Sequence, residues 1–472
     1  MGPEAKKLHM LFFPFMSQGH MPPMISMAKL FAAHGARITI LTTPVNAANI
    51  RPTIDDSIHF HIIPLPSADF GLPDGCENDS LVINDDQRIR FFRAVASLRH
   101  HFDASLQDLR PDCVVSGTFL PWTYHVAAAR GVPRLVFNGS GNFAACAFSA
   151  FDRCRHLLAD KVESFILPGL PHQIEMLRTQ VMDVKKLAGT SFEFLLEIIN
   201  EAMELEPKNF GTLVNSFYGL EPEYADQYRK EVGRSWNVGP ASLYKVGDNK
   251  TASGREQSAS ANECLKWLDK KPAGSVVYMC FGSGSSFSAE QLREMALGLE
   301  AAGHPFVWVV SDKGHDWVPD GFEKRTHGTG LVIREWAPQV LILNHAAVGG
   351  FVTHCGWNST LEGISAGLPM VTWPLFAEQF YNEKFLLDVV EVGVAVGSKV
   401  HTFVAEARPV VKADAIEAAV REVMGKGEKA EERKMRAKML AEMAKIAVDK
   451  EGSSFEEIQN LMQELMDLKK HV

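Results

Sequence analysis

The chain has 472 residues, of which 46% are hydrophobic and 22% charged, and its formal net charge is −9. That length exceeds one ordinary hydrophobic core and predicts two globular domains, whereas the acidic balance argues against a nucleic-acid groove. Seven cysteines are scattered without a C-x-x-C pair, which excludes a disulfide scaffold and predicts a reducing, cytoplasmic location.

The first element is predicted to be a strand, followed by a loop and a helix, in the stretch LHMLFFPFMSQGHMPPMISMAKL (8–30). Its apolar run is interrupted by Pro14 and is followed by apolar residues with helical spacing. We therefore interpret the run as a core strand and not as a signal peptide. No apolar stretch reaches the length of a transmembrane helix, and no stable membrane insertion is expected. The loop carries His20, where a nucleotide-binding α/β domain usually has glycines around a phosphate.

The rest of the first half alternates short apolar runs with helical patterns. Strands are predicted at 36–43, 57–65, 112–117, 133–139 and 211–217, the last being the final strand of this half, and helices at 85–109 and 190–205. Strands that alternate with helices indicate a parallel sheet covered on both faces.

A Gly/Ser-rich and charged segment, 236–261, lacks apolar periodicity and is interpreted as a linker with a mobile loop. A second α/β series follows it. Its strands are predicted at 274–282, 304–310, 330–336, 347–354 and 368–374, and Ser288 with Gln291 predicts a capping box at the start of a helix. Near the C-terminus, Phe455, Ile458, Met462 and Leu465 share one helical face, which predicts a helix that packs across the domain boundary.

The most informative segment runs from Trp336 to Phe380, WAPQVLILNHAAVGGFVTHCGWNSTLEGISAGLPMVTWPLFAEQF. A strand ends at His354, and a helix begins near Gly356–Asn358 and ends at Gly367, a residue type typical of helix C-termini. The free N–H groups and the dipole of that helix N-terminus form an anion site. His354 can add a hydrogen bond or a positive charge to a phosphate there.

Other side chains of the segment fit the remaining parts of a nucleotide sugar. Trp336 can stack on a flat base, Glu362 can accept hydrogen bonds from ribose hydroxyls, and Glu378 and Gln379 offer groups for a sugar. Taken singly, such residues are more often core, solvated or capping residues. Their combination in one short segment favours a nucleotide-sugar site.

The segment 336–379 resembles the 44-residue signature of plant UDP-sugar-dependent glycosyltransferases of secondary metabolism, with WAPQ, HCGWNS and a final acidic residue followed by Gln. The resemblance extends over nearly the whole chain. It implies the α/β GT-B fold, in which two Rossmann-like domains face each other across a cleft. The expected boundaries are 1–240 for the acceptor domain, 241–261 for the linker, 262–450 for the donor domain and 451–472 for a C-terminal helix on the first domain.

The resemblance also implies roles for single residues. Trp336 stacks on uracil beside Ala337, and Gln339 contacts the base or ribose. Glu362 binds the ribose hydroxyls. The residues implied for the diphosphate are Ser283, His354, Asn358 and Ser359, and those for the sugar are Trp357, Glu378 and Gln379. Gly356 is also implied as a donor-binding residue. Trp357 and Gln379 go with glucose in this family, so UDP-glucose is the expected co-substrate.

His20 matches the catalytic base of the family, between the two domains. An acceptor hydroxyl must lose its proton as it attacks C1 of glucose, and an imidazole with an ordinary pKa of about 6.5 suits that task. A single displacement inverts the anomeric centre and predicts a β-glucoside. The chain contains no D-x-D sequence, so no metal and no further cofactor are expected.

One position departs from the family pattern. The resemblance implies an aspartate that orients the histidine, but this chain has Gly117 there. Asp112 is five strand residues, about 16 Å, away. Thr118 or Ser116 could bond the imidazole without supplying charge. A weaker base matters least for acidic acceptors, so a flavonoid or another phenol is the preferred acceptor, with triterpenoid or steroid alcohols second.

The acceptor contacts implied by the resemblance are Gly19, Phe119, Phe143, Phe192 and Leu195, each of which can equally be a core residue. The expected partners are a UDP-sugar and a small hydrophobic acceptor, and the protein is expected to be a monomer. Two other functions remain. A dinucleotide-dependent oxidoreductase is disfavoured, because the chain lacks a G-x-G-x-x-G sequence after a strand. A weakly catalytic UDP-sugar-binding protein is the other alternative, because Gly117 stands where the aspartate is expected.

Overall fold

The computed structural model describes residues 7–158, 162–182, 187, 189–190, 192–244, 259–310 and 317–470. The chain forms two compact units, each described by itself. Unit 1 comprises residues 1–141, 183–255 and 446–472, and unit 2 comprises residues 142–182 and 256–445. Residues 142–182 were expected in the first domain, 1–240, but they belong to unit 2. There α6 (Asn142–Cys154) packs against α14 (Gln379–Lys384).

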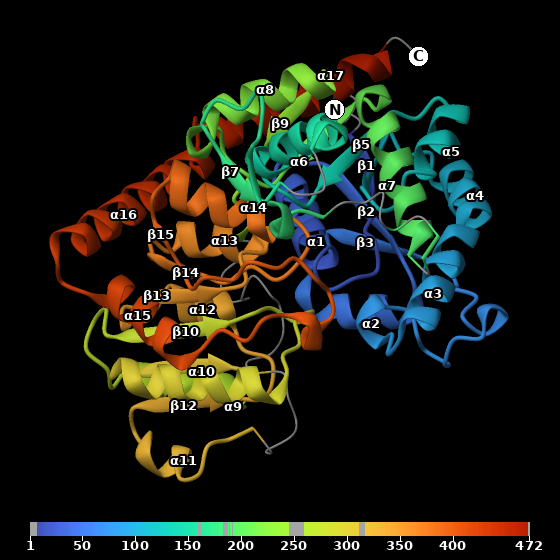
Figure 1. Ribbon diagram of the computed structural model, residues 1–472. Helices are drawn as coiled ribbons and strands as arrows, with labels where there is room; N and C mark the ends of the chain where they lie inside the picture. Colours follow the sequence, from blue (N-terminus) through green and yellow to red (C-terminus); the bar gives the residue numbers. More distant parts are fainter. Residues whose placement is uncertain are drawn as a thin grey trace. The chain divides into compact units, whose positions relative to one another are not determined.

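Unit 1 is built on one parallel sheet in the order β3-β2-β1-β4-β5-β8-β9. Figure 1 labels β1, β2, β3, β5 and β9 of this sheet. Its strands are β1 (His9–Phe13), β2 (Arg37–Thr42), β3 (Ile58–Ile62), β4 (Cys113–Gly117), β5 (Arg134–Asn138), β8 (Gly211–Val214) and β9 (Ser235–Asn237). This is the strand order of a Rossmann fold with one strand added. The prediction that 211–217 held the last strand was wrong, because β9 pairs with β8 at the edge.

The helices of unit 1 connect and cover these strands. They are α1 (Met21–Ala33), α2 (Pro44–Ile50), α3 (Asp85–Ser97), α4 (Arg99–Leu109), α5 (Thr123–Ala129), α7 (Glu193–Leu205), α8 (Pro222–Val232) and α17 (Ser453–Lys470). The single helix predicted at 85–109 is two helices. The chain bends at Leu98, whose N–H donates to the Val95 carbonyl three residues back instead of continuing the α-helical pattern.

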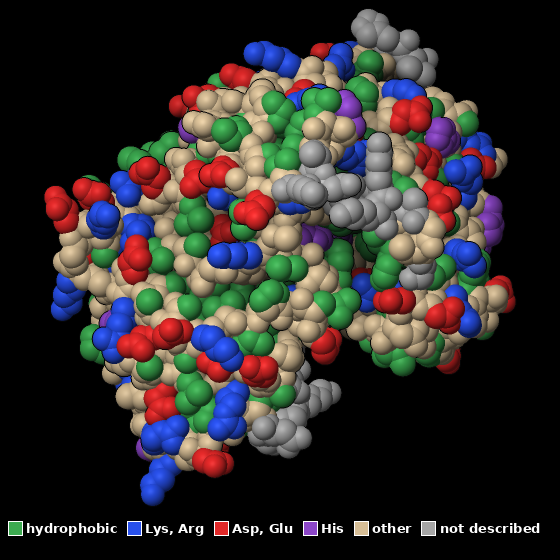
Figure 2. All heavy atoms as spheres, in the orientation of Figure 1, with side chains coloured by type: hydrophobic (Ala, Val, Ile, Leu, Met, Phe, Trp, Pro, Cys, Tyr) green, Lys and Arg blue, Asp and Glu red, His purple; other side chains and the backbone are tan. Residues whose placement is uncertain are grey.

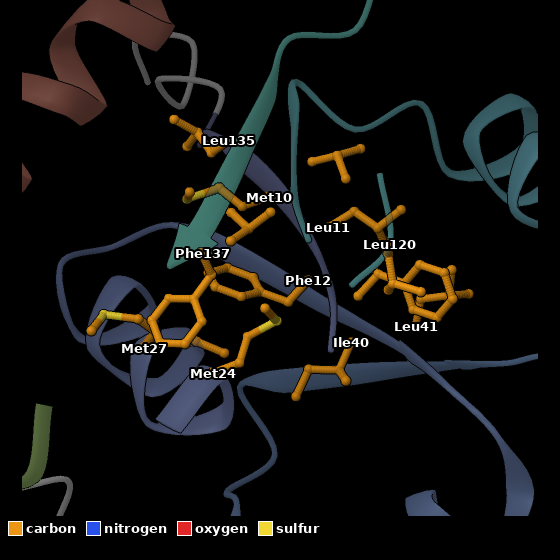
Figure 3. Packing of buried hydrophobic residues seen from close by; sticks show 14 of the residues in the cluster. Met10, Leu11, Phe12, Met24, Met27, Ile40, Leu41, Leu120, Leu135 and Phe137 are labelled. Atoms are coloured by element: carbon orange, nitrogen blue, oxygen red, sulfur yellow. The ribbon is translucent and has the colours of Figure 1, made fainter. Parts of the chain in front are cut away.

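The core of unit 1 lies between the sheet and its helices. Figure 3 shows Met24 and Met27 of α1 directed toward Phe12 of β1 and Phe137 of β5. Strand β1 is buried along its whole length, as expected for a central parallel strand covered on both faces.

The C-terminal helix α17 completes this core. Ile458, Leu461, Met462 and Leu465 are buried in the same hydrophobic cluster as β1, and α17 lies beside β9 (Figure 1). The Ser454 hydroxyl also donates to the Gly239 carbonyl at 2.6 Å. The helical face predicted from the sequence is therefore a packing face for unit 1.

Unit 2 has a second parallel sheet, in the order β12-β11-β10-β13-β14-β15. Its strands are β10 (Val276–Cys280), β11 (Phe306–Val309), β12 (Gly330–Ile333), β13 (Val348–Thr353), β14 (Met370–Thr372) and β15 (Gly393–Ala395), with a separate antiparallel hairpin of β6 (Ser164–Ile166) and β7 (Glu175–Leu177). The sequence analysis did not predict the short edge strand β15.

Besides α6 and α14, the α-helices of this half are α9 (Ala259–Leu268), α10 (Ala289–Ala302), α11 (Phe322–Arg325), α12 (Gln339–Leu343), α13 (Trp357–Ser365), α15 (Ala413–Met424) and α16 (Glu428–Val448). Ser288 caps α10 by accepting from the Gln291 N–H. Gln291 does not complete the predicted capping box, because its amide forms two hydrogen bonds with the backbone of Val411 instead.

The predicted linker 236–261 is only partly irregular. It begins inside β9, contains a short 3-10 helix at Ala241–Leu243 and ends inside α9. Residues 245–258 of this predicted linker and mobile loop lie outside the described residues.

Acidic and basic side chains are interspersed over the face in Figure 2. Among the described residues, no helix is both long and apolar enough to cross a membrane.

Candidate active site

The candidate site residues follow the central strands of the two sheets. In sheets of this order, ligands bind outside the carboxyl ends of the strands where the order reverses. In unit 2 these strands are β10, followed by Gly282 and Ser283, and β13, followed by His354. In unit 1 they are β1, whose following loop carries His20, and β4, which ends at Gly117.

The N-terminus of α13 lies directly after β13. Cys355 has a φ of +63°, and Gly356 is the N-cap without a side chain to accept from the helix. The Glu378 carboxylate takes that role, because its Oε1 accepts from the Trp357 N–H at 3.2 Å. Asn382 supports the turn by donating to the Cys355 carbonyl at 2.8 Å. Glu378 thus fixes the first turn of the proposed phosphate-binding helix.

The His354 ring is held between two glycines. A Cβ on Gly282 would lie 3.1 Å from its Cε1, and a Cβ on Gly356 would lie 2.5 Å from its Nε2. Burial lowers the pKa of His354 to about 4, so the imidazole is neutral at pH 7 and offers a hydrogen bond rather than the alternative positive charge. Its Nδ1 is buried and has no hydrogen-bond partner among the described residues.

Glu362 is held in place by Gln339. The Gln339 Nε2 donates to Glu362 Oε2 at 2.8 Å and to the Ser359 hydroxyl at 3.0 Å. The Tyr278 hydroxyl donates to the Gln339 Oε1 at 3.4 Å. Burial raises the pKa of Glu362 to about 7, and the Gln339 hydrogen bond opposes that shift. The carboxylate is therefore poorly solvated and gains from additional hydroxyl donors.

The remaining residues expected near the base and phosphates lie in loops. Trp336 is 40% exposed in the connection between β12 and α12, so it does not end the strand, and its ring is accessible to a flat ligand. Ala337 is buried. Ser283 is exposed in the loop after β10, and Asn358 is half-buried in the first turn of α13.

Two residues expected near the sugar also have structural contacts. Gln379 is buried, and its Oε1 accepts from the N–H groups of Leu375 (2.9 Å) and Phe376 (3.1 Å). Trp357 is 2% exposed, and its ring packs near Phe385 at 6.2 Å. The indole is therefore part of the packing in this arrangement, whereas the Gln379 amide nitrogen can still serve a ligand.

In unit 1, His20 lies at the start of α1 and is half-buried. Its ring makes edge contacts with Phe15 at 5.8 Å and Phe119 at 5.0 Å, and a Cβ on Gly139 would lie 3.7 Å from its Nδ1. Burial lowers the pKa of His20 to about 4, and no described residue hydrogen-bonds to the imidazole. At pH 7 it is thus a neutral, unoriented base.

Phe119 belongs to a group of aromatic rings that the sequence did not identify as a whole. We call it the aromatic cluster: Phe15, Phe91, Phe92, Phe119, Phe192 and Phe194, linked by ring-to-ring distances of 5.0–6.4 Å. Four of the rings, those at 92, 119, 192 and 194, are half-buried. They provide an accessible apolar surface on the same unit as His20, suited to an aromatic or alicyclic ligand.

The other acceptor candidates differ in accessibility. Gly19 is exposed, and Leu195 is half-buried on α7. Phe143 is completely buried in unit 2, and its ring packs at a tilt against that of Phe385, with 5.3 Å between ring centroids, so its role here is packing.

Ser116, Thr118 and Asp112 do not replace the carboxylate missing at Gly117, because each is bonded elsewhere. Ser116 is hydrogen-bonded to Thr123 and to Arg134. Thr118 donates to the Phe137 carbonyl at 3.4 Å. Asp112 lies at the other end of β4, where it accepts from the His9 N–H and from Lys469. None of these groups bonds to His20.

Among the described residues, no group of three or more His, Cys, Asp or Glu side chains is arranged to hold a metal ion. All seven cysteines are buried and free.

Comparisons with known proteins cover nearly the whole chain. Residues 241–441 match the family model described as "UDP-glucoronosyl and UDP-glucosyl transferase". The chain is 45% identical to UDP-glycosyltransferase 73B4 of Arabidopsis thaliana, covering 98% of this chain and 99% of the relative. It is also 45% identical to UDP-glucose flavonoid 3-O-glucosyltransferase 7 of Fragaria ananassa, covering 98% and 97%.

A solved structure has the same fold. The crystal structure of Glycyrrhiza uralensis UGT73P12 complexed with glycyrrhetinic acid 3-O-monoglucuronide superimposes with a TM-score of 0.89, at 38% identity, and covers 99% of this chain and 97% of that one.

Proposed function

Because this chain belongs to the plant UDP-glycosyltransferase family, with the two Rossmann-like sheets of the GT-B fold, we propose that it transfers glucose from UDP-glucose to a hydroxyl of a small hydrophobic acceptor. One observation carries the proposal. Unit 2 carries an exposed indole after β12, a carboxylate on α13 held by an amide on α12, and a helix N-terminus beside an imidazole whose Nδ1 is buried. These groups match a base, a ribose and a diphosphate.

In this proposal the donor is bound from base to sugar along unit 2. Trp336 stacks on uracil, and Glu362, oriented by Gln339, accepts from the ribose hydroxyls. The diphosphate accepts from backbone N–H groups of α13 and from the neutral His354. Since the Gln379 Oε1 is already used by the backbone, its Nε2 is the group available to a glucose hydroxyl.

We assign general base catalysis to His20. Its neutral imidazole takes the proton of the acceptor hydroxyl as the oxygen forms a bond to C1 of glucose and the bond from C1 to UDP breaks. A single displacement gives a β-glucoside. The departing negative charge is stabilised by the N-terminus of α13, so turnover should continue in EDTA. Loss of activity in EDTA that Mg²⁺ or Mn²⁺ restores would contradict this arrangement.

The acceptor class follows from the weak base. With its pKa near 4 and no carboxylate partner, His20 provides little driving force for proton transfer from an alkyl hydroxyl. A phenol ionises near 10, whereas water and alcohols lie near 15.7. Phenols such as flavonoids are therefore the preferred acceptors, which agrees with the flavonoid named for the strawberry relative. The triterpenoid-type ligand of UGT73P12 supports alicyclic alcohols as the second class.

The test is a panel of flavonoids, simple phenols, triterpenoids and steroids with UDP-glucose, with products identified by mass spectrometry and the anomeric configuration by NMR. We expect β-glucosides of phenols at the highest kcat/KM. UDP-glucose binding without turnover of any acceptor would instead support the alternative, a weakly catalytic UDP-sugar-binding protein. Faster turnover of alcohols than of phenols would contradict the argument from His20.

A further inference from the structure

A buried asparagine of unit 2 lies between the two turns that carry the proposed phosphate and sugar contacts. Asn382 is on α14 and is completely buried. We call residues 355–357, between β13 and the start of α13, the phosphate turn, and residues 375–379, between β14 and the start of α14, the sugar turn (Figure 1). Helices α13 and α14 pack against each other, so the two turns are neighbours.

The Asn382 amide forms hydrogen bonds with both turns. Its Nδ2 donates to the Cys355 carbonyl at 2.8 Å and to the Glu378 Oε1 at 3.4 Å. Both partners are acceptors, and an amide nitrogen carries two hydrogens, so one side chain serves both. The same Glu378 oxygen accepts from the Trp357 N–H at 3.2 Å. The phosphate turn is therefore held at its first residue by Asn382 and at its last by Glu378, which Asn382 also holds.

Each turn contains a residue other than glycine with a positive φ. Cys355 has a φ of +63° in the phosphate turn, and Ala377 has a φ of +53° in the sugar turn. Residues with a Cβ seldom adopt this conformation, which persists only where surrounding contacts hold it. Asn382 bonds to the carbonyl of Cys355 and to the side chain that follows Ala377, so its amide supplies such contacts to both turns.

Glu378 depends on the same bonds for its charge. Burial raises the pKa of Glu378, and hydrogen bonds from the backbone and from Asn382 oppose that shift. Without the Asn382 amide, the carboxylate loses a donor and the Cys355 carbonyl loses its side-chain partner. Buried acceptors left unpaired are costly, so both turns should relax toward other conformations.

We propose that Asn382 is a positioning residue that holds the phosphate turn and the sugar turn in the single arrangement that binds the diphosphate and the glucose together. This inference rests on the proposed function and deepens it. Asn382 is buried and touches no substrate. It acts through the Cys355 carbonyl and through Glu378.

The test measures the affinities of uridine, UDP and UDP-glucose for the full chain by calorimetry, well below the Tm of each variant. Asn382→Ala should weaken UDP about tenfold and UDP-glucose by a larger factor, because UDP uses only the phosphate turn whereas UDP-glucose uses both. Uridine should bind within about twofold of its original affinity, because Gln339 holds Glu362 without Asn382. A side chain that only stabilised unit 2 would not separate the three ligands in this way.

Two further variants complete the experiment. Asn382→Leu keeps the volume of the side chain and removes the donor, so it should repeat the pattern, and it replaces Asn382→Ala if that variant does not fold. The matched control is Gln291→Ala. Gln291 is another buried amide of unit 2, bonded to the backbone of Val411 and to neither turn. Its loss should lower the Tm and leave all three affinities within about twofold.

The inference is overturned if uridine loses as much affinity as UDP in the Asn382 variants, or if UDP and UDP-glucose bind them as tightly as the unaltered chain. Turnover of UDP-glucose with a phenol is measured on the unaltered chain. Turnover there with no separation of the ligands in the variants refutes the role of Asn382 alone. An unaltered chain that binds no UDP-glucose refutes the proposed function and the inference with it.

Discussion

The replacement Gly117→Asp tests how much His20 loses by having no carboxylate partner. The backbone at Gly117 does not have a positive φ, and an added Cβ would meet only Met24 and Phe15, at 3.8 and 3.9 Å. Successive side chains alternate across a strand. Because Ser116 faces Arg134, residue 117 points to the opposite side, where Phe15 contacts His20.

The size of the effect follows from the pKa of His20. A carboxylate that restored the pKa from about 4 to an ordinary 6.5 would contribute about 3.4 kcal/mol of proton affinity, at about 1.36 kcal/mol for each tenfold change. If about half of this appears in the transition state, turnover of an alcohol acceptor rises roughly 20-fold. A phenol, which needs less help from the base, should gain less.

The assay is kcat/KM against pH for one alcohol and one phenol acceptor, with Gly117→Asn as the neutral control of similar size. A carboxylate stabilises the protonated imidazole and raises its pKa, so the acid limb of the profile should move from near pH 4 toward pH 6.5. Equal gains in a His20→Ala background, or slower turnover of every acceptor at an unchanged Tm, would refute the reasoning.

Three further outcomes are expected. Gly356→Ala places a Cβ 2.5 Å from the confined His354 ring and should weaken UDP binding at least tenfold. The control Gly284→Ala should not weaken it, because its Cβ meets nothing within 4 Å. Equal affinities of the two variants in calorimetry would argue against the role of His354. Uridine should bind more tightly as the pH rises from 5.5 to 8, because ribose hydroxyls favour the ionised form of Glu362, whose pKa is about 7. Glu362→Gln should make the affinity for uridine independent of pH over this range. Gln379→Ala should lower the Tm, since two backbone N–H groups lose their acceptor. It should also reduce the affinity for UDP-glucose more than the affinity for UDP. An equal loss of affinity for both ligands would count against a sugar contact.

The candidate donor site was predictable because most of it lies in one continuous segment. From 336 to 379 the residue types, the strand end and the helix N-terminus could all be interpreted locally. What could not be predicted were contacts made over long sequence distances. The glycine that confines His354 from one side is Gly282, and the carboxylate that caps α13 comes from Glu378.

The acceptor side shows the same limit more strongly. The aromatic cluster combines rings from the end of β1, from α3, from the loop after β4 and from α7, and no pattern in the sequence relates these segments. Edge strands β9 and β15 were missed for a related reason. Each has three residues, too few for a period, and only pairing with a neighbouring strand defines it.

The return of the chain to unit 1 affects how the protein can fold during synthesis. Unit 1 lacks α17, with its buried Ile458 and Leu461, until residues 453–470 have left the ribosome. At about 5–20 residues per second, translating the 190 residues from 256 to 445 takes about 10–40 s. During that interval the apolar surface that α17 covers stays exposed on a nascent chain. C-terminal truncations and fusions should therefore reduce the soluble yield through unit 1, although they alter none of the proposed donor-binding residues.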